Sequence, residues 1–248
     1  MNAHMNSLNR KKSTKVDAGK PVPVSRKKIM LVDDHPMMRA GLAQLINKQR
    51  DLETCCELGN AAEAFEGLRK FDPDLVLTDI TLPGKSGIEL IKDLLVADPE
   101  LPILVVSMHD ETVYAERVLR AGARGYIMKE SGGENLLVAI RHVLSGQVYV
   151  SPRISARILD NLSARKPRGS SSPIEKLSDR EFEIFQLIGQ GKGTRDIARQ
   201  LHLSPKTVET HRGHLKEKLG LKGATALVHQ ATRWFEAEAS CLSKVPPG

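Results

Sequence analysis

The sequence predicts an α/β domain built on a doubly wound sheet of five parallel strands, followed by a small all-α domain. Five short apolar runs alternate with stretches of helical periodicity between residues 28 and 146, which is typical of a parallel sheet covered by helices. Beyond residue 175 the apolar residues recur at helical spacing only. A length of 248 residues accommodates two domains of ordinary size.

The charges are divided unevenly along the chain. Basic residues exceed acidic ones by 8 to 1 in residues 1–28, by 5 to 2 in 147–175 and by 12 to 8 in 176–248. Residues 29–146 instead hold 19 acidic residues against 12 basic ones. This partition indicates that the C-terminal domain binds a polyanion, whereas the acidic domain has a different task. For the basic N-terminal segment, a solvated surface is an equally good interpretation.

Several classes of protein are disfavoured by the sequence. No apolar run approaches the ~20 residues of a membrane helix. The basic N-terminus lacks the apolar centre of a secretory signal. Cys55, Cys56 and Cys241 do not show the paired spacing of a zinc or redox site. We therefore expect a cytoplasmic protein without membrane contact and with ordinary thiols.

The first strand is predicted at residues 28–32, where an apolar run leads into two acidic residues, Asp33 and Asp34. Pro36 suits the first turn of the helix that follows. The apolar face of that helix is formed by Met38, Leu42, Leu45 and Ile46. The second strand and the second helix are predicted at residues 52–58 and 61–70.

The third strand, residues 74–79, ends in Asp79 and is followed by a Pro-Gly loop. Asp79 could instead be the cap of the next helix. That helix, however, begins near Ser86 or Gly87, several residues later. Ligands bind beyond the carboxyl ends of the strands in open parallel sheets, so Asp79 is placed for chemistry.

The last two units repeat the alternation. The fourth strand, residues 102–107, ends at Ser107 and precedes a helix at 112–120. The fifth strand, residues 125–129, ends at Lys129 and precedes a helix at 133–145.

Polar side chains therefore converge at one edge of the predicted sheet. They are three carboxylates (Asp33, Asp34 and Asp79), the Ser107 hydroxyl and the Lys129 ammonium. Carboxylates that lie close together repel one another and need a cation, and Mg²⁺ prefers such oxygen ligands. With the metal and Lys129 neutralising charge, Asp79 can attack a phosphoryl group. Taken alone, Lys129 and Ser107 are ordinary surface and strand-end residues, and it is their joint arrival that indicates a site.

This constellation resembles the flavodoxin-like receiver domain of two-component response regulators. The residues that carry the resemblance are Asp33, Asp34, Asp79, Pro83, Gly87, Ser107, Tyr126 and Lys129. The resemblance covers about residues 28–146 and implies that Asp79 is the phosphoacceptor. It also implies that Asp34, Asp79 and the backbone carbonyl of Thr81 bind Mg²⁺, with Asp33 acting through water.

The same resemblance implies that Ser107 and Tyr126 are a switch pair, and that the hydroxyl of Ser107 moves toward the phosphate while the aromatic ring swings into the vacated space. A simple packing role for Tyr126 is the alternative. Thr81 and His109 occupy positions at which such domains tune the lifetime of the phosphate.

The expected organisation of the chain has five parts. They are a flexible basic tail (1–27), the phosphoacceptor domain (28–146), a linker with a short helix at 151–162 and a tether at 166–173 (147–174), a small all-α domain (175–238) and a C-terminal tail (239–248).

The C-terminal domain is helical by pattern. Ser178 and Glu181 have the spacing of a capping box at the start of the first helix. A second helix at 194–201 and a third beginning at Pro205 are joined by a tight turn, which is typical of a helix-turn-helix. An ordinary helical hairpin in a small bundle is the alternative. Trp234 and Phe235 are expected to serve core or dimer packing.

The sequence of this segment resembles that of the LuxR-type DNA-binding domain. The two domains in this order resemble the NarL/FixJ class of response regulators. The matching stretches are Leu177 to Glu181, Ile197-Ala198, Leu203-Ser204, Thr207 to His211 and Lys218 to Gly220. The resemblance implies that residues 205–219 form the recognition helix in the major groove. Glu209, Thr210 and Gly213 would face bases, and Lys206, Thr207, Arg212 and Lys216 would contact phosphates. Glu209 could accept from cytosine N4 or merely remove a phosphate contact.

We therefore expect a transcription regulator rather than an enzyme. A sensor histidine kinase or a small phosphodonor would phosphorylate Asp79, and homodimers would then bind a two-fold operator. A Mg²⁺-dependent phosphohydrolase is the enzymatic alternative, although no general base is evident beside Asp79. A third possibility keeps the fold without the switch, as a constitutive DNA-binding protein or a receiver for protein partners.

Overall fold

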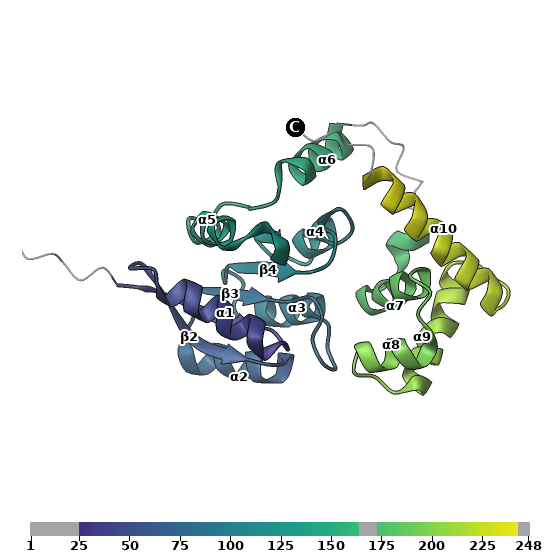
Figure 1. Cartoon of the computed structure of the whole chain (residues 1–248), viewed down its shortest axis with the longest axis horizontal. Helices are drawn as coiled ribbons and strands as arrows, with labels where there is room; N and C mark the ends of the chain where they lie inside the picture. The colour runs from purple at the N-terminus through teal and green to yellow at the C-terminus, as the bar shows by residue number, and fades with distance from the viewer. Residues whose placement is uncertain (1–24, 164–172, 243–248) are drawn as a thin grey trace, which may run out of the picture.

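The computed structural model describes residues 25–163 and 173–242. Most of the expected basic tail, most of the tether and the end of the C-terminal tail lie outside the described residues. The N-terminal domain comprises β1 (Lys27–Val32), α1 (Pro36–Asn47), β2 (Leu52–Leu58), α2 (Ala61–Phe71), β3 (Leu75–Thr78), α3 (Gly87–Ala97), β4 (Ile103–Ser107), α4 (Glu111–Arg120), β5 (Gly125–Met128), η1 (Lys129–Ser131) and α5 (Gly133–Leu144) (Figure 1).

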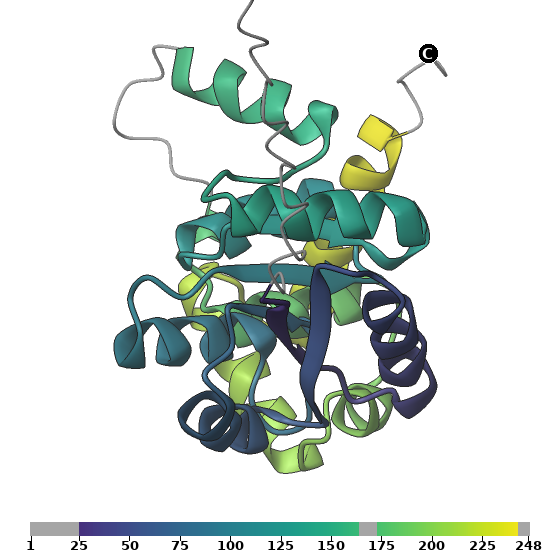
Figure 2. The ribbon, with the colours of Figure 1, turned by 90° about the vertical axis from the view of Figure 1, so that its left-hand side faces the viewer.

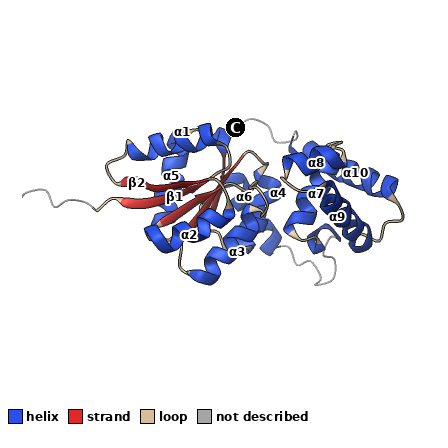
Figure 3. Cartoon of the chain, turned by 90° about the horizontal axis from the view of Figure 1, so that it is seen from below, coloured by secondary structure: helices blue, strands red, loops and turns tan. Residues whose placement is uncertain are grey.

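The five strands form one parallel sheet in the order β2-β1-β3-β4-β5. Helices cover both of its faces (Figure 3). Alternate residues of β1 face opposite sides: Ile29 and Leu31 pack in one buried cluster with α1 and α5, whereas Met30 and Val32 pack in the other with α2, α3 and α4. The predicted doubly wound sheet is thereby confirmed.

The first strand begins one residue earlier than predicted, at Lys27, and the third, Leu75–Thr78, is one residue shorter at each end. The last two strands also differ slightly from the prediction. The fourth strand begins at Ile103 rather than at Pro102, whose nitrogen carries no hydrogen for the ladder. The fifth ends at Met128, and Lys129 opens a short 3₁₀ helix. Both shifts leave Ser107 and Lys129 at the same edge of the sheet.

Beyond the sheet lie α6 (Pro152–Ser163), η2 (Pro173–Lys176), α7 (Asp179–Gly189), α8 (Thr194–Gln200), α9 (Pro205–Lys218) and α10 (Ala224–Leu242). The expected capping box of α7 is present, because Ser178 and Glu181 each accept from the other's backbone N–H. Trp234 of α10 packs edge-on against Phe182, with ring centroids 5.5 Å apart, and lies 5.8 Å from Phe185. Core packing of Trp234 is thus confirmed.

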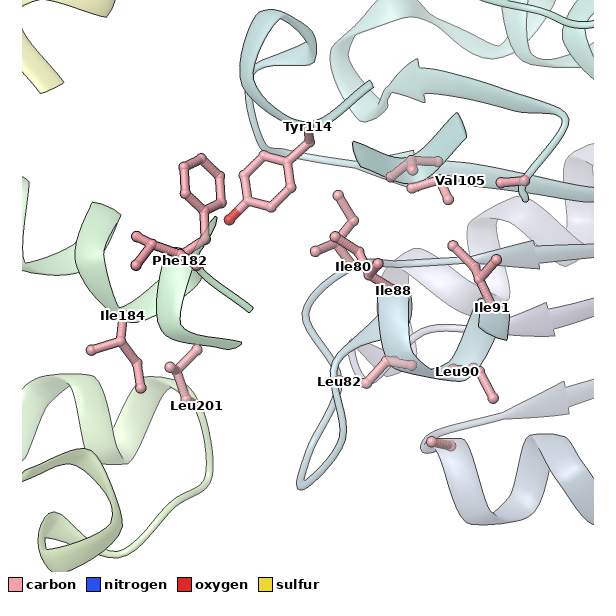
Figure 4. Packing of buried hydrophobic residues seen from close by; sticks show 14 of the residues in the cluster. Ile80, Leu82, Ile88, Leu90, Ile91, Val105, Tyr114, Phe182, Ile184 and Leu201 are labelled. Atoms are coloured by element: carbon pink, nitrogen blue, oxygen red, sulfur yellow. The ribbon is translucent and has the colours of Figure 1, made fainter. Parts of the chain in front are cut away.

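The two domains are packed against each other, which the sequence did not predict. Viewed from the end of the N-terminal domain, the C-terminal helices lie directly behind the sheet (Figure 2). Tyr114 of α4 meets Phe182 of α7, with ring centroids 5.7 Å apart (Figure 4). One buried hydrophobic cluster runs through this contact into both domains.

Two ion pairs of the interface join α3 and α4 to the first residue of α7. Asp179 lies 2.8 Å from Lys92 Nζ and 3.5 Å from Arg117 Nη1.

Over residues 25–163 and 173–242, none of the helices combines the length and apolar character that a bilayer crossing requires.

Candidate functional site

The predicted polar residues converge at the carboxyl edge of the sheet. Asp33 and Asp34 follow β1, Asp79 follows β3, Ser107 ends β4 and Lys129 follows β5. These strands are neighbours in the order β1-β3-β4-β5, so their ends meet at one place.

Lys129 links the two most buried carboxylates of this edge. Its Nζ lies 2.6 Å from Asp33 Oδ2 and 2.7 Å from Asp79 Oδ2, and all three side chains are at most 5% exposed. Burial by itself lowers the pKa of the Lys129 ammonium, but the charges and hydrogen bonds of Asp79 and Asp33 outweigh burial and leave that pKa raised. Lys129 is therefore held in its charged form beside Asp79.

The carboxylates also satisfy the requirements of a hard cation. Ligand atoms of Asp33, Asp34, His35 and Asp79 lie within 4.8 Å of one another. Asp34 Oδ1 is buried without a hydrogen-bond partner, although His35 Nδ1 approaches it to 2.7 Å. A buried carboxylate oxygen that receives no hydrogen bond fits the role of a metal ligand. The assignment of the Thr81 carbonyl stays a prediction.

His109 connects the acceptor loop with the expected switch residues. Its Nε2 lies 2.9 Å from Thr81 Oγ1, its N–H donates to Ser107 Oγ over 3.4 Å, and its carbonyl accepts from the Tyr126 hydroxyl over 2.6 Å. Burial lowers the pKa of the His109 imidazole and raises that of the Tyr126 phenol. Ser107 and Tyr126 are both buried, and their ring-and-hydroxyl arrangement is compatible with the switch and with plain packing.

Asp34, Asp79 and Lys129 line a cavity of about 700 Å³ that the C-terminal domain helps to close. Its wall includes Arg199, Gln200 and His202, and His202 Nε2 lies 3.8 Å from Asp34 Oδ2. Sequence reasoning missed these three residues. They reach the site only because the two domains pack together. No sequence motif or hydrophobic periodicity predicts such packing.

The expected helix-turn-helix is formed by α8 and α9. Ser204 caps α9 by accepting from the N–H of Thr207. Of the residues predicted to contact DNA, Lys206, Glu209 and Thr210 are exposed, whereas Thr207, Arg212, Gly213 and Lys216 are partly buried.

Glu209 is held by its own domain. Its Oε1 accepts from Thr194 Oγ1 over 2.6 Å and lies 3.7 Å from Arg212 Nε. Neither interpretation proposed for Glu209 from the sequence included this contact with the first helix of the motif. The side chain of Arg212 is only 13% exposed, so in this conformation it is less available to a phosphate than Lys206.

A phosphoacceptor-type acidic edge joined to a helix-turn-helix defines a response regulator. Comparison with known families agrees: residues 29–141 match the response regulator receiver domain, and residues 175–231 match the bacterial regulatory proteins of the LuxR family. The chain belongs to the response regulators of the NarL/FixJ class, a family of DNA-binding transcription regulators.

Individual relatives cover most of the chain or a little over half of it. The oxygen regulatory protein NreC of Staphylococcus aureus (strain MRSA252) is 37% identical over 210 residues, which span 83% of this chain and 97% of that protein. Among solved structures, a LuxR-family response regulator from Aurantimonas sp. SI85-9A1 is 37% identical with a TM-score of 0.52, covering 56% of this chain and 99% of that one. RcsB of Salmonella enterica serovar Typhimurium, bound to the promoter rprA in the presence of phosphomimetic BeF₃⁻, is 25% identical with a TM-score of 0.56, covering 84% and 99%.

Proposed function

We propose that Asp79 accepts a phosphoryl group from a sensor histidine kinase or a small phosphodonor, and that this modification controls dimerisation and promoter binding. The observation that carries the proposal is the position of Lys129, whose ammonium lies within 2.7 Å of both Asp33 and Asp79 at a buried sheet edge. A structural ion pair alone would not need a third carboxylate beside it, Asp34, whose buried Oδ1 receives no hydrogen bond and is approached by His35 Nδ1.

In the proposed reaction a carboxylate oxygen of Asp79 forms a bond to phosphorus while the bond between phosphorus and the donor atom breaks. The donor atom is an imidazole nitrogen when the donor is a kinase. Lys129 neutralises charge on the phosphoryl oxygens, and the hydroxyl of Ser107 turns to donate to one of them. Mg²⁺, held by Asp34, Asp79 and the carbonyl of Thr81 with Asp33 acting through water, would supply further neutralisation.

The added charge is the signal. A phosphate on Asp79 changes the partners of Ser107, and His109 lies between Ser107 and Tyr126. Reorientation of Tyr126 would thus be coupled to the acceptor through groups that already touch. The single-turnover labelling expected of a switch separates this proposal from a phosphohydrolase, which would release inorganic phosphate from a small ester over many turnovers.

The C-terminal domain would read DNA with α9 in the major groove. Glu209, Thr210 and Gly213 are the proposed base-facing positions, and Lys206, Thr207, Arg212 and Lys216 are the proposed phosphate contacts. A dimer of this motif reads two half-sites about 34 Å apart, or multiples of that spacing, in a two-fold operator. The RcsB relative in complex with its promoter supports this role. Such a function places the protein in the cytoplasm with the chromosome.

Replacement of Asp79 by asparagine tests the coupling. Asp79→Asn should abolish uptake of labelled phosphate from acetyl phosphate and remove the phosphodonor-dependent gain in operator binding, measured by gel shift on fragments selected with the parent protein. Asp93→Asn is the matched control, because Asp93 lies partly exposed on α3 in a surface pair with Lys85. Operator binding by Asp79→Asn that still rises with acetyl phosphate would refute the proposal.

A further inference from the structure

A second cavity lies between the two domains, apart from the phosphoacceptor edge. Its volume is about 420 Å³, which is within the range of small-molecule sites. The walls come from α3, α4 and α6 on one side and from η2, α7 and α10 on the other. The two cavities share no lining residue, so this space plays no part in the chemistry proposed for Asp79.

Cationic side chains dominate the lining. Lys92, Arg117, Arg120 and Arg157 are opposed by only two carboxylates, Glu116 and Asp179. Lys92 and Arg117 share Asp179, and Arg120 pairs with Glu116 over 2.6 Å. Arg157 donates to the neutral carbonyl of Thr112 over 2.9 Å, and within the described residues it forms no ion pair. The cavity therefore has an excess of positive charge equivalent to two cations.

Arg117 is a cation in the buried part of the lining, where it shares the charge of Asp179 with Lys92. Its guanidinium lies 3.7 Å from the centroid of the Phe182 ring and donates to the carbonyls of Ile174 and Leu177. Burial lowers the pKa of Arg117, and the charge of Asp179 opposes that effect. An anion in the cavity would therefore meet a cation that is poorly hydrated, which strengthens the attraction.

An aromatic surface completes the lining. Trp234 borders the cavity and is partly exposed, while its ring is fixed edge-on against Phe182. A rigid, partly exposed indole is suited to stacking on a planar heterocycle. A ligand that carries both a dianionic group and a planar ring would match the cationic side chains and the Trp234 ring of this lining.

We propose that this cavity binds a nucleotide, with its phosphate near Arg157 and its base against Trp234. A phosphate monoester carries about −1.5 to −2 charges at neutral pH, which balances the excess of the lining. Because the walls belong to both domains, the ligand binds the packed arrangement and stabilises it by mass action. The site would give the regulator a second input that does not pass through Asp79.

Trp234 provides a direct readout, because it is the only tryptophan of the chain. The full-length protein would be titrated with AMP and GMP while the emission of Trp234 is followed, with adenosine, guanosine and inorganic phosphate as separate arms. We expect a saturable change with at least one nucleotide and affinity at least tenfold weaker for the nucleosides and for phosphate. Absence of a saturable change, confirmed by calorimetry, would overturn the proposal. Equal affinity for inorganic phosphate would overturn it as well.

Two arginines of α6 give a matched pair of variants. Arg157 lines the cavity, whereas Arg153 is exposed on the same helix and does not line it. Arg157→Ala should weaken nucleotide binding about tenfold, equivalent to about 1.4 kcal/mol, and Arg153→Ala should leave it unchanged. Both variants should keep the phosphate uptake of the parent from acetyl phosphate, which shows that they are folded. Equal affinities of the two variants for the nucleotide would place the ligand elsewhere.

Discussion

Charge compensation by Lys129 is the residue-scale feature on which the acidic carboxyl edge of the sheet depends. Its side chain is 3% exposed and those of Asp33 and Asp79 are 4% and 5% exposed. The convergence of these residues was predictable, because each follows or ends an apolar run that predicts a strand. Parallel strands bring their carboxyl ends to the same edge of a sheet. The hydrogen bond between Thr81 and His109 was not predictable, since it joins two loops whose conformations no local pattern fixes.

Replacing Lys129 tests this compensation. Lys129→Met leaves two buried carboxylates without their cation, and the expected loss of unfolding free energy is about 3–5 kcal/mol. Addition of Mg²⁺ should restore part of the loss, because the metal takes over the missing positive charge. Urea unfolding with and without Mg²⁺ measures both effects.

Lys85→Met is the control for that experiment. Lys85 pairs with Asp93 where both side chains are 44% exposed, and the loss should be about 0–1 kcal/mol. Losses of similar size in the two variants would contradict the role assigned to Lys129.

His211 of α9 makes stability depend on pH. Burial lowers the pKa of its imidazole, and the charge of Arg180 lowers it further. As the pH falls through about 6.5, the unfolded chain binds a proton that the folded imidazole still refuses, so the free energy of unfolding decreases. Above that pH the imidazole is neutral in both states and the effect vanishes. His211→Gln should therefore lose less stability than the parent between pH 7 and pH 5.5 in urea unfolding. Parallel curves for the two proteins would rule this out.

At the scale of elements, the start of α3 packs closely against the loop that follows β3. Gly87 is the first residue of α3, and its N–H donates to the carbonyl of Ile80 over 2.7 Å. A Cβ at Gly87 would lie 2.0 Å from the carbonyl oxygen of Asp79 and 2.8 Å from Ile80 Cα. The helix can approach the loop after β3 this closely only because residue 87 has no side chain.

Gly87→Ala should consequently destabilise the protein by about 1–3 kcal/mol or more, since backbone atoms must shift. Gly41→Ala in α1 is the control, because nothing lies within 4 Å of its added Cβ. Alanine there should raise stability by about 1 kcal/mol through helix propensity. Thermal and urea unfolding of both variants measure the contrast, and a neutral Gly87→Ala would show that the loop yields without cost.

Elements were the most predictable level of this molecule. The apolar runs that became β1, β3 and β4 are buried throughout their inner residues, so their hydrophobicity identifies them without reference to context. The start of α7 was equally accessible, because Ser178 and Glu181 form their capping box within four residues. The unpredicted detail at Lys129 is a turn of 3₁₀ helix, whose bonds span too few residues to leave a periodic signature.

The arrangement of the whole molecule could not be predicted from the sequence. Arg117 and Asp179 look like ordinary helix charges in the sequence, yet they meet across the domain interface at 3.5 Å. Tyr114 lies in the helix predicted at 112–120, and nothing in that pattern indicates that its ring reaches Phe182 of the other domain. Such contacts depend on the linker and on the orientation of the two domains relative to each other. Neither produces a periodic pattern in the sequence.

Asp179 offers a test of domain packing. Asp179→Asn removes the carboxylate that Lys92 and Arg117 share, so the domains should separate more readily and the radius of gyration in solution scattering should increase. The control is Asp196→Asn, because Asp196 also lies in the first turn of a helix but pairs only with Arg199 of the same helix among the described residues. An unchanged radius for Asp179→Asn at low ionic strength would show that apolar contacts suffice.

The end of α8 and the turn that follows it have a kinetic consequence for the proposed phosphorylation. Arg199, Gln200 and His202 border the space through which a donor must reach Asp79. A compact donor such as acetyl phosphate fits into about 700 Å³ without displacing a domain. A phosphohistidine carried by a kinase brings a protein surface with it and needs the domains to part first. The rate of phosphorylation by a kinase is then limited by the fraction of molecules in which the two domains are apart. A small phosphodonor can react with Asp79 without that separation.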